Sequence, residues 1–162
     1  MEKGINLAMT KSLADFEALL DKAIEAASEK KLTIRFDMDD TNVWKYQVGR
    51  YVEIIDDNDD DEIIFWIGFG WETNEKREPC LWLEFDAATC PPKYWDKANK
   101  LVGSSGKYCT KINFEFAQVY MSAWLHFYLN EEYLKKLYDE NVGLNAQKEI
   151  LLGFINEVMG KF

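Results

Sequence analysis

The sequence predicts an α+β fold with a mainly antiparallel sheet of about six strands and helices packed on the sheet. Three observations support this: amphipathic helical patterns near both ends, four alternating segments in succession, and an aromatic content of 15%. Strands that come in blocks, rather than alternating with helices, are typical of α+β proteins. The expected order of elements is α-β-β-β-β-α-β-β-α-α. A length of 162 residues is usual for one domain, so we expect a single globular domain over residues 1–162.

The first expected helix begins after Ser12, whose side chain can cap it, with Asp15 in the first turn. It ends near Lys30 and Lys31, where cations suit the helix C-terminus. Its apolar residues recur at helical spacing and form one stripe. They are Leu13, Phe16, Leu19, Leu20, Ala23, Ile24 and Ala27.

Four segments then alternate between apolar and polar residues, as half-buried strands do. They span residues 32–36, 46–55, 62–71 and 80–85. Their connections are polar and mostly short, which favours an antiparallel meander. In particular, we expect residues 49–55 and 62–70 to form a hairpin closed by an aspartate-rich turn over 56–61.

The second half of the chain predicts three more helices and two strands. Pro91 and Pro92 suit the first turn of a helix over residues 89–102. The alternating run over 108–129 is too long for one strand, so we expect a break near 116–118. Asn130 is expected to cap the next helix, which ends at residues 141–143, and Asn145 is expected to cap the last one.

The net charge of −10 is concentrated in one stretch of the chain. Between Asp37 and Glu62, ten acidic residues stand against Lys45 and Arg50, which gives this stretch a net charge of −8. Such a field repels nucleic acid and anionic membranes and attracts basic surfaces. We therefore expect neither a nucleic acid nor a membrane as a direct partner, and we expect a protein with a basic surface.

The cysteines and the chain start favour the cytoplasm. Cys80, Cys90 and Cys109 are odd in number, widely spaced and without a CxxC pair, which predicts reduced thiols. The first residues lack the apolar core of a signal peptide, and no apolar run is long enough to span a bilayer. His126 is the single histidine, so a zinc site is not expected, and we predict no cofactor.

Three catalytic or metal-binding patterns fail on inspection. Asp56, Asn58 and Asp60 match the first three ligand positions of an EF-hand loop, but the sixth and twelfth positions hold Asp61 and Ile67. A solvated turn is the simpler interpretation. A magnesium-dependent nuclease would need a lysine beside the strand carboxylates and a basic surface, and the sequence offers neither. A thiol enzyme would need a cysteine beside His126, and the sequence does not indicate that any cysteine lies near it.

Aromatic residues occupy the strand faces opposite the most apolar ones. They are Trp66, Trp82, Tyr120, Trp124 and Tyr128. One interpretation is a second, half-buried core layer under a helix or loop. The other is an exposed aromatic platform that seats a ligand or a partner.

These observations predict a non-enzymatic protein–protein interaction domain whose acidic surface, residues 37–62, docks on a basic partner. The expected partner-binding residues are Asp56, Asp57, Asp59, Asp60, Asp61, Glu62 and, as the aromatic anchor, Trp44. A sharper form of this function is a DNA-mimic inhibitor. The alternative is a small-molecule-binding or hydrolytic enzyme with an aromatic-lined pocket and the strand carboxylates Glu53, Glu84 or Glu115. A purely structural subunit is the third hypothesis.

Overall fold

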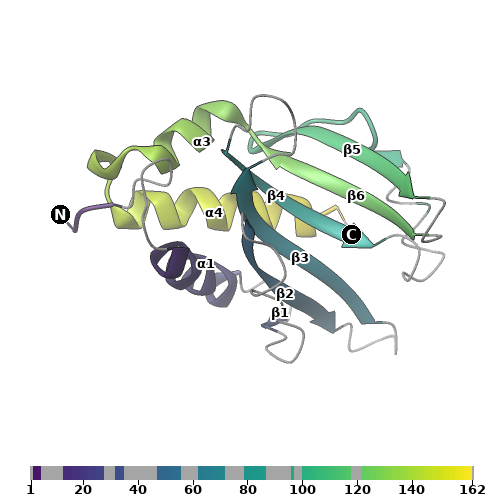
Figure 1. Cartoon of the computed structure of the whole chain (residues 1–162), viewed down its shortest axis with the longest axis horizontal. Coiled ribbons are helices and arrows are strands. Elements are labelled where there is room, and N and C mark those ends of the chain that lie inside the picture. The colour runs from purple at the N-terminus through teal and green to yellow at the C-terminus, as the bar shows by residue number, and fades with distance from the viewer. Residues whose placement is uncertain are drawn as a thin grey trace.

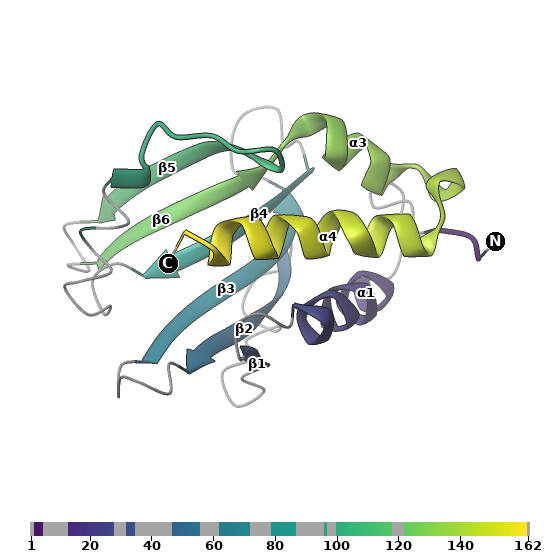
Figure 2. The same ribbon diagram turned by 180° about the vertical axis from the view of Figure 1, so that it is seen from behind.

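The fold is seen in a computed structural model that describes residues 2–4, 13–27, 32–34, 47–55, 62–71, 79–86, 96, 100–117 and 122–161. Within these residues an antiparallel sheet has helices against one of its faces (Figure 1 and Figure 2). None of the helices in this part of the chain is long and apolar enough to cross a membrane.

The strands are paired in an order that departs from the chain order once. They are β1 (Leu32–Ile34), β2 (Gln47–Ile55), β3 (Glu62–Trp71), β4 (Pro79–Asp86), β5 (Cys109–Ala117) and β6 (Ser122–Leu129). The order across the sheet is β1-β2-β3-β4-β6-β5, and every neighbouring pair is antiparallel. The first four strands form a meander, and the chain then crosses over β6 so that β5 ends the sheet.

The helices are arranged in two ways around the sheet. They are α1 (Leu13–Ala26), α3 (Glu131–Tyr138), the one-turn 3-10 helix η2 (Glu140–Val142) and α4 (Leu144–Met159). Helices α1 and α4 pack against one another on one face, and Figure 2 shows α4 running across that face. Helix α3 packs against α4 and lies beyond the end of β6 (Figure 1).

The core lies between the sheet and the helices α1 and α4. Alternate residues of the central and edge strands are buried there: Ile67, Ile112, Leu125, Phe127 and Leu129. The helices bury Leu19, Leu20, Ala23, Ile24, Ile150, Leu151, Phe154, Ile155, Val158 and Met159. Each large apolar side chain that becomes fully buried contributes roughly 1.5–3 kcal/mol. The described part of the stripe predicted for the first helix, from Leu19 to Ala27, therefore holds α1 on α4 and the sheet.

Several sequence predictions are confirmed. The class, α+β with an antiparallel sheet, is correct. Strands β2 and β3 pair antiparallel over the whole of the predicted hairpin segments, residues 49–55 and 62–70. The long alternating run does break after Ala117. Asn130 does cap α3, because its Oδ1 accepts a hydrogen bond of 2.8 Å from the backbone N–H of Glu132.

The predicted order α-β-β-β-β-α-β-β-α-α, with all helices packed on the sheet, is wrong for the part of the chain that the structure describes. That part contains three α-helices where four were expected, and α3 packs on α4 rather than on the sheet. Within the predicted helix over 89–102, only Asp96 and residues 100–102 are described, and of these Asp96, Lys100 and Leu101 are helical. The other residues of this predicted helix lie outside the described part of the chain.

The start of the last helix is also corrected. Asn145 does not cap it, because α4 begins at Leu144 and Gly143 occupies the N-cap position without a side-chain hydrogen bond. Gly143 has a φ of 89°, which strongly favours glycine. The backbone turn at Gly143, and not a capping side chain, therefore sets where α4 begins.

Candidate functional site

The predicted acidic stretch includes the end of β2 and the start of β3. Ile55 at the end of β2 is directly opposite Glu62 at the start of β3, so residues 56–61 connect two paired strands. The arrowhead of β2 lies at the end of the sheet away from α3 (Figure 1). Glu62 is the one predicted site residue among those described. The others, Asp56, Asp57, Asp59, Asp60, Asp61 and Trp44, lie outside the described residues.

The side of the sheet opposite α1 and α4, called here the second face, carries a row of chemically active residue types. Strand register sets Trp66 opposite Glu84, Glu84 opposite His126, and His126 opposite Asn113. Tyr51 is opposite Trp66 at the other end of this central row. Residues directly opposite one another share a face. The central row therefore crosses five strands, and it was not predicted as a unit.

Two further rows flank the central row on the same face, because strand residues two apart share a face. One row sets Trp82 opposite Tyr128, and Tyr128 opposite Lys111. The other sets Asp86 opposite Trp124, and Trp124 opposite Glu115. The aromatic residues Trp66, Trp82, Trp124 and Tyr128 thus share one face, as predicted. Tyr120 lies outside the described residues.

Burial confirms which face these rows occupy. Along β6, Leu125, Phe127 and Leu129 are buried in the core, while the alternating His126 and Tyr128 are half-buried. The rings of His126 and Tyr128 meet edge to face, with centroids 6.2 Å apart and an interplanar angle of 82°. The second face thus combines an imidazole, carboxylate residues and aromatic residues. Such a set can bind cations through aromatic faces or exchange protons.

The strand carboxylates of the alternative hypothesis are not all brought together. Glu84 is opposite His126, and Glu115 is in the row of Trp124 and Asp86. Glu53 is opposite Thr33 of β1 and Ile64 of β3, away from the histidine. The sequence held no signal for the pairing of Glu84 with His126, because it arises where β4 pairs with β6 rather than with the next strand in the chain.

A second polar cluster joins α4 to the start of β5. The Glu157 carboxylate accepts hydrogen bonds from the backbone N–H of Tyr108, at 3.1 and 3.2 Å, and of Cys109, at 2.8 Å. Cys109 is buried as a reduced thiol. The Tyr108 ring lies over Gly153 of α4 and 4.7 Å from the ring of Tyr133, centroid to centroid.

Lys107 belongs to the same cluster at its exposed rim. Its Nζ lies 4.9 Å from the centroid of the Tyr108 ring. The side-chain hydrogen bond with Tyr108 raises the pKa of Lys107 above its ordinary value of 10.5, helped by the charge interactions with Tyr108, Tyr133 and Glu157. Because Lys107 is fully exposed, we interpret the cluster as a clamp between α4 and β5 rather than as a catalytic site.

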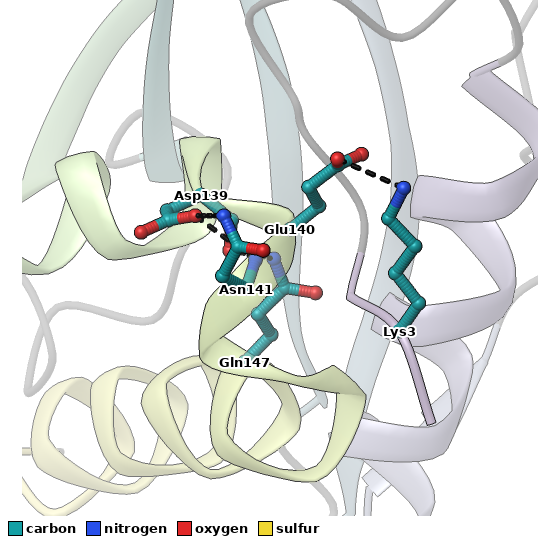
Figure 3. Close-up of polar contacts among 5 residues, drawn as sticks. All are labelled: Lys3, Asp139, Glu140, Asn141 and Gln147. Atoms are coloured by element: carbon teal, nitrogen blue, oxygen red, sulfur yellow. Dashed lines mark hydrogen bonds and ion pairs between the residues drawn. The ribbon is translucent and has the colours of Figure 1, made fainter. Parts of the chain in front are cut away.

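A third cluster fixes the connection between α3 and α4, as Figure 3 shows. Gln147 is completely buried, and its Nε2 donates to the carbonyl oxygens of Leu137, at 3.4 Å, and Asp139, at 3.5 Å. The Asp139 side chain accepts from the backbone N–H of Asn141 at 2.9 Å and so closes the 3-10 turn. These contacts satisfy buried backbone groups, which is a structural role.

The N-terminal segment docks on this connection. The backbone N–H of Gly4 donates to the Glu140 carbonyl at 2.9 Å, and that of Leu144 donates to the Glu2 carbonyl at 3.3 Å. The Lys3 ammonium lies 2.8 Å from a Glu140 carboxylate oxygen (Figure 3). This segment therefore holds the start of α4 in place.

The arrangement on the second face and the acidic stretch are the two features of the chain that suggest function. Comparison with protein-family models, with curated proteins and with solved structures gives no match to this chain.

Proposed function

We propose that the chain is a non-enzymatic protein–protein interaction domain that docks its acidic stretch, residues 37–62, on a basic surface of a partner protein. The observation that carries this is the concentration of acidic residues in the connection between two paired strands. Residues 56–61 connect Ile55 to Glu62 at the end of a long antiparallel pair, and five of these six residues are aspartates. A partner with a basic surface would meet many carboxylates within one short segment.

The negative charge of this cluster would speed association with a basic partner. Like charges in one short segment repel one another, which disfavours the compact state without adding any contact. A basic partner offsets that repulsion and is steered toward the cluster during diffusional encounter. Trp44, in the same acidic stretch, supplies the aromatic anchor that such interfaces need at their centre.

The test neutralises the aspartates without changing their size. In the variant Asp57→Asn, Asp59→Asn, Asp60→Asn, Asp61→Asn, the free energy of unfolding should stay equal or rise slightly, because solvated repulsion is relieved. Association with a basic protein captured from lysate should slow, and the wild-type rate should fall as salt rises. Thermal melts and association rates at two ionic strengths measure both effects.

A matched control removes the same amount of charge elsewhere. The variant Glu2→Gln, Glu25→Gln, Asp96→Asn, Glu149→Gln changes four exposed positions outside the acidic stretch. It should keep most of the wild-type association rate. Equal rates for the two quadruple variants would mean that only the net charge matters, and a large loss of stability in the first would make the aspartates structural.

A sharper form of the proposal is that the acidic stretch imitates the charge of DNA and inhibits a DNA-binding protein. In that form, duplex DNA and the chain should compete for the captured partner. The partner should bind either one, and the asparagine variant should compete less well than the wild type. A partner that binds DNA and the chain at once would reject this form while leaving the interaction function intact.

The second candidate is a small-molecule-binding or hydrolytic enzyme, and the pairing of Glu84 with His126 specifically favours it. A histidine beside a carboxylate is a common acid–base arrangement. For this candidate, the hydrolysis of p-nitrophenyl acetate or p-nitrophenyl phosphate should be lost in His126→Gln and in Glu84→Gln. The quadruple asparagine variant should retain it, so the two functions are separable.

A further inference from the structure

Two tyrosines from distant parts of the chain are held ring against ring. Tyr108 directly precedes β5 and Tyr133 lies in α3. Their ring centroids are 4.7 Å apart, and the ring planes are tilted by 34°. Both residues are half-buried, so neither is sealed inside the core. The two phenols are therefore in contact with one another and remain accessible to small molecules in solution.

The Tyr108 ring is fixed by contacts with the backbone of three elements. The backbone N–H of Tyr108 donates to the Glu157 carboxylate, and its carbonyl accepts from the Asn130 N–H at 2.6 Å. Gly153 of α4 faces the ring, and a Cβ there would first meet Cζ, Cε2 and the hydroxyl Oη. Cε1, the other carbon ortho to the hydroxyl, is farther from this glycine. The fold thus leaves one ortho carbon of Tyr108 clear of α4.

Each ring of the pair also has a lysine ammonium near its face. Lys107 Nζ lies 4.9 Å from the ring centroid of Tyr108, and Lys136 Nζ lies 5.0 Å from that of Tyr133. Lys136 is itself held by an ion pair of 3.1 Å with Glu132. A cation over an aromatic face is attracted to it. These contacts keep the two rings in their mutual orientation.

We propose that Tyr108 and Tyr133 are a site of oxidative cross-linking, at which a haem peroxidase with hydrogen peroxide joins the two rings as a dityrosine. Each phenol loses one electron and its hydroxyl proton and becomes a neutral phenoxyl radical. A carbon–carbon bond then forms between two ortho carbons, Cε1 on the Tyr108 side. Each of these carbons releases its hydrogen as a proton, and each oxygen takes up a proton again. The pair has then lost two electrons and two protons, which reduce the peroxide to two waters.

The contact between the rings makes this coupling selective. Two radicals that form within one contact react as one molecule, whereas radicals on separate tyrosines have to meet by diffusion or by unfolding. The neutral charge of a phenoxyl radical also means that the two ammonium groups do not oppose it. The bond would tie the start of β5 to α3, so the cross-linked chain should unfold at a higher temperature. This inference goes beyond the proposed function and does not depend on it.

Peroxidase treatment at low protein concentration tests the site. We expect dityrosine fluorescence from a product that keeps the monomer mass of 19.0 kDa. After trypsin digestion, mass spectrometry should find residues 108–111, which contain Tyr108 as their one tyrosine, joined to residues 112–135. Fragmentation should place the bond on Tyr133 and not on Tyr120 or Tyr128. In urea, where the contact is lost, the links should spread over the eight tyrosines of the chain.

The variant Tyr133→Phe keeps a ring at this position but removes the phenol. Residues 108–111 should then stay unlinked, at or below about a tenth of the wild-type yield. Tyr138→Phe is the matched control, because Tyr138 is a half-buried tyrosine of the same helix, and it should keep the wild-type yield. Circular dichroism shows that both variants are folded.

Three results would overturn the proposal. The first is a folded wild-type chain in which Tyr108 stays unlinked or is linked mainly to other tyrosines. The second is a Tyr133→Phe variant in which Tyr108 is linked as often as in the wild type. The third is a Tyr138→Phe variant that loses the link, since the bond would then involve Tyr138.

Discussion

The Glu157 carboxylate on α4 accepts a hydrogen bond of 2.8 Å from the backbone N–H of Cys109, the first residue of β5. This contact joins the last helix to the edge of the sheet over a distance of 48 positions in the chain. The same carboxylate also accepts from the Tyr108 N–H. A charged acceptor thus takes up backbone donors at the end of a sheet, where no strand supplies an acceptor in the described part of the chain.

Glu157→Gln should lower the free energy of unfolding by roughly 1–3 kcal/mol, because the carboxylate loses its charge and only one of the two oxygens remains as an acceptor. Urea unfolding followed by tryptophan fluorescence measures the loss. Glu149→Gln on the same helix is the control, since Glu149 is exposed and lies 4.0 Å from Lys148, and its effect should stay within about 0.5 kcal/mol. Equal effects in the two variants would show that Glu157 acts only through net charge.

Gly153→Ala should also destabilise the protein, although alanine favours a helix more than glycine does. A Cβ at this position would meet the Tyr108 ring, so the ring or α4 has to move, at a cost of roughly 1–3 kcal/mol. In a Tyr108→Ala background the obstruction is removed, and the same substitution should become neutral or stabilising by up to about 1 kcal/mol. A double-mutant cycle measures this change of sign, and additivity would contradict it.

Gln147→Leu should cost roughly 1–3 kcal/mol, since it leaves the buried carbonyl of Leu137 and the part-buried carbonyl of Asp139 without the Nε2 donor. Lys3→Met removes a shorter contact, the ion pair with Glu140, yet it should change stability by less than about 0.5 kcal/mol. The Lys3 side chain is 70% exposed, and exposed pairs gain little over hydration. Chemical denaturation measures the free energy of unfolding of both variants. A larger loss in Lys3→Met than in Gln147→Leu would refute this account of the contacts around the start of α4.

The raised pKa of Lys107 should fall toward 10.5 in Tyr108→Phe, because the phenyl ring keeps the packing but not the hydroxyl hydrogen bond. A raised pKa in the folded state means that Lys107 stabilises the fold below its unfolded pKa, and that this contribution is lost as pH rises through the raised value. Side-chain NMR titration of Lys107 measures the pKa directly. An identical titration curve in the two proteins would assign the shift to another cause.

Local patterns predicted single elements well where one physical signal dominated. Asn130 was recognised as a cap because its short side chain is followed directly by two acidic residues and a helical stripe. Asn145 carries the same residue type, yet α4 begins one position before it, because Gly143 turns the backbone at a positive φ. A residue type indicates that a helix start is near, whereas backbone geometry decides its position.

The candidate site was less predictable, because it depends on pairing between strands that are distant in the chain. Period-two alternation was enough to group Trp66, Trp82 and Tyr128 on one face. It could not show that Glu84 lies opposite His126, since alternation does not specify which strand is the neighbour or in which register. The acidic residues 56–61 were recognised from their composition alone, and their role in binding stays a prediction.

The pairing of β4 with β6 also joins two parts of the sheet, and it is the pairing whose strands lie far apart in the chain. The meander β1–β4 and the hairpin β5–β6 each join strands that follow one another in the chain. Their junction requires residues 79–86 to find residues 122–129, so chain entropy is lost before that contact is gained. We expect the β4–β6 pairing to be absent from the earliest folding intermediates and to be formed at the rate-limiting step. Substitutions between β4 and β6 should then slow folding. Substitutions within the meander β1–β4 or the hairpin β5–β6 should mainly speed unfolding.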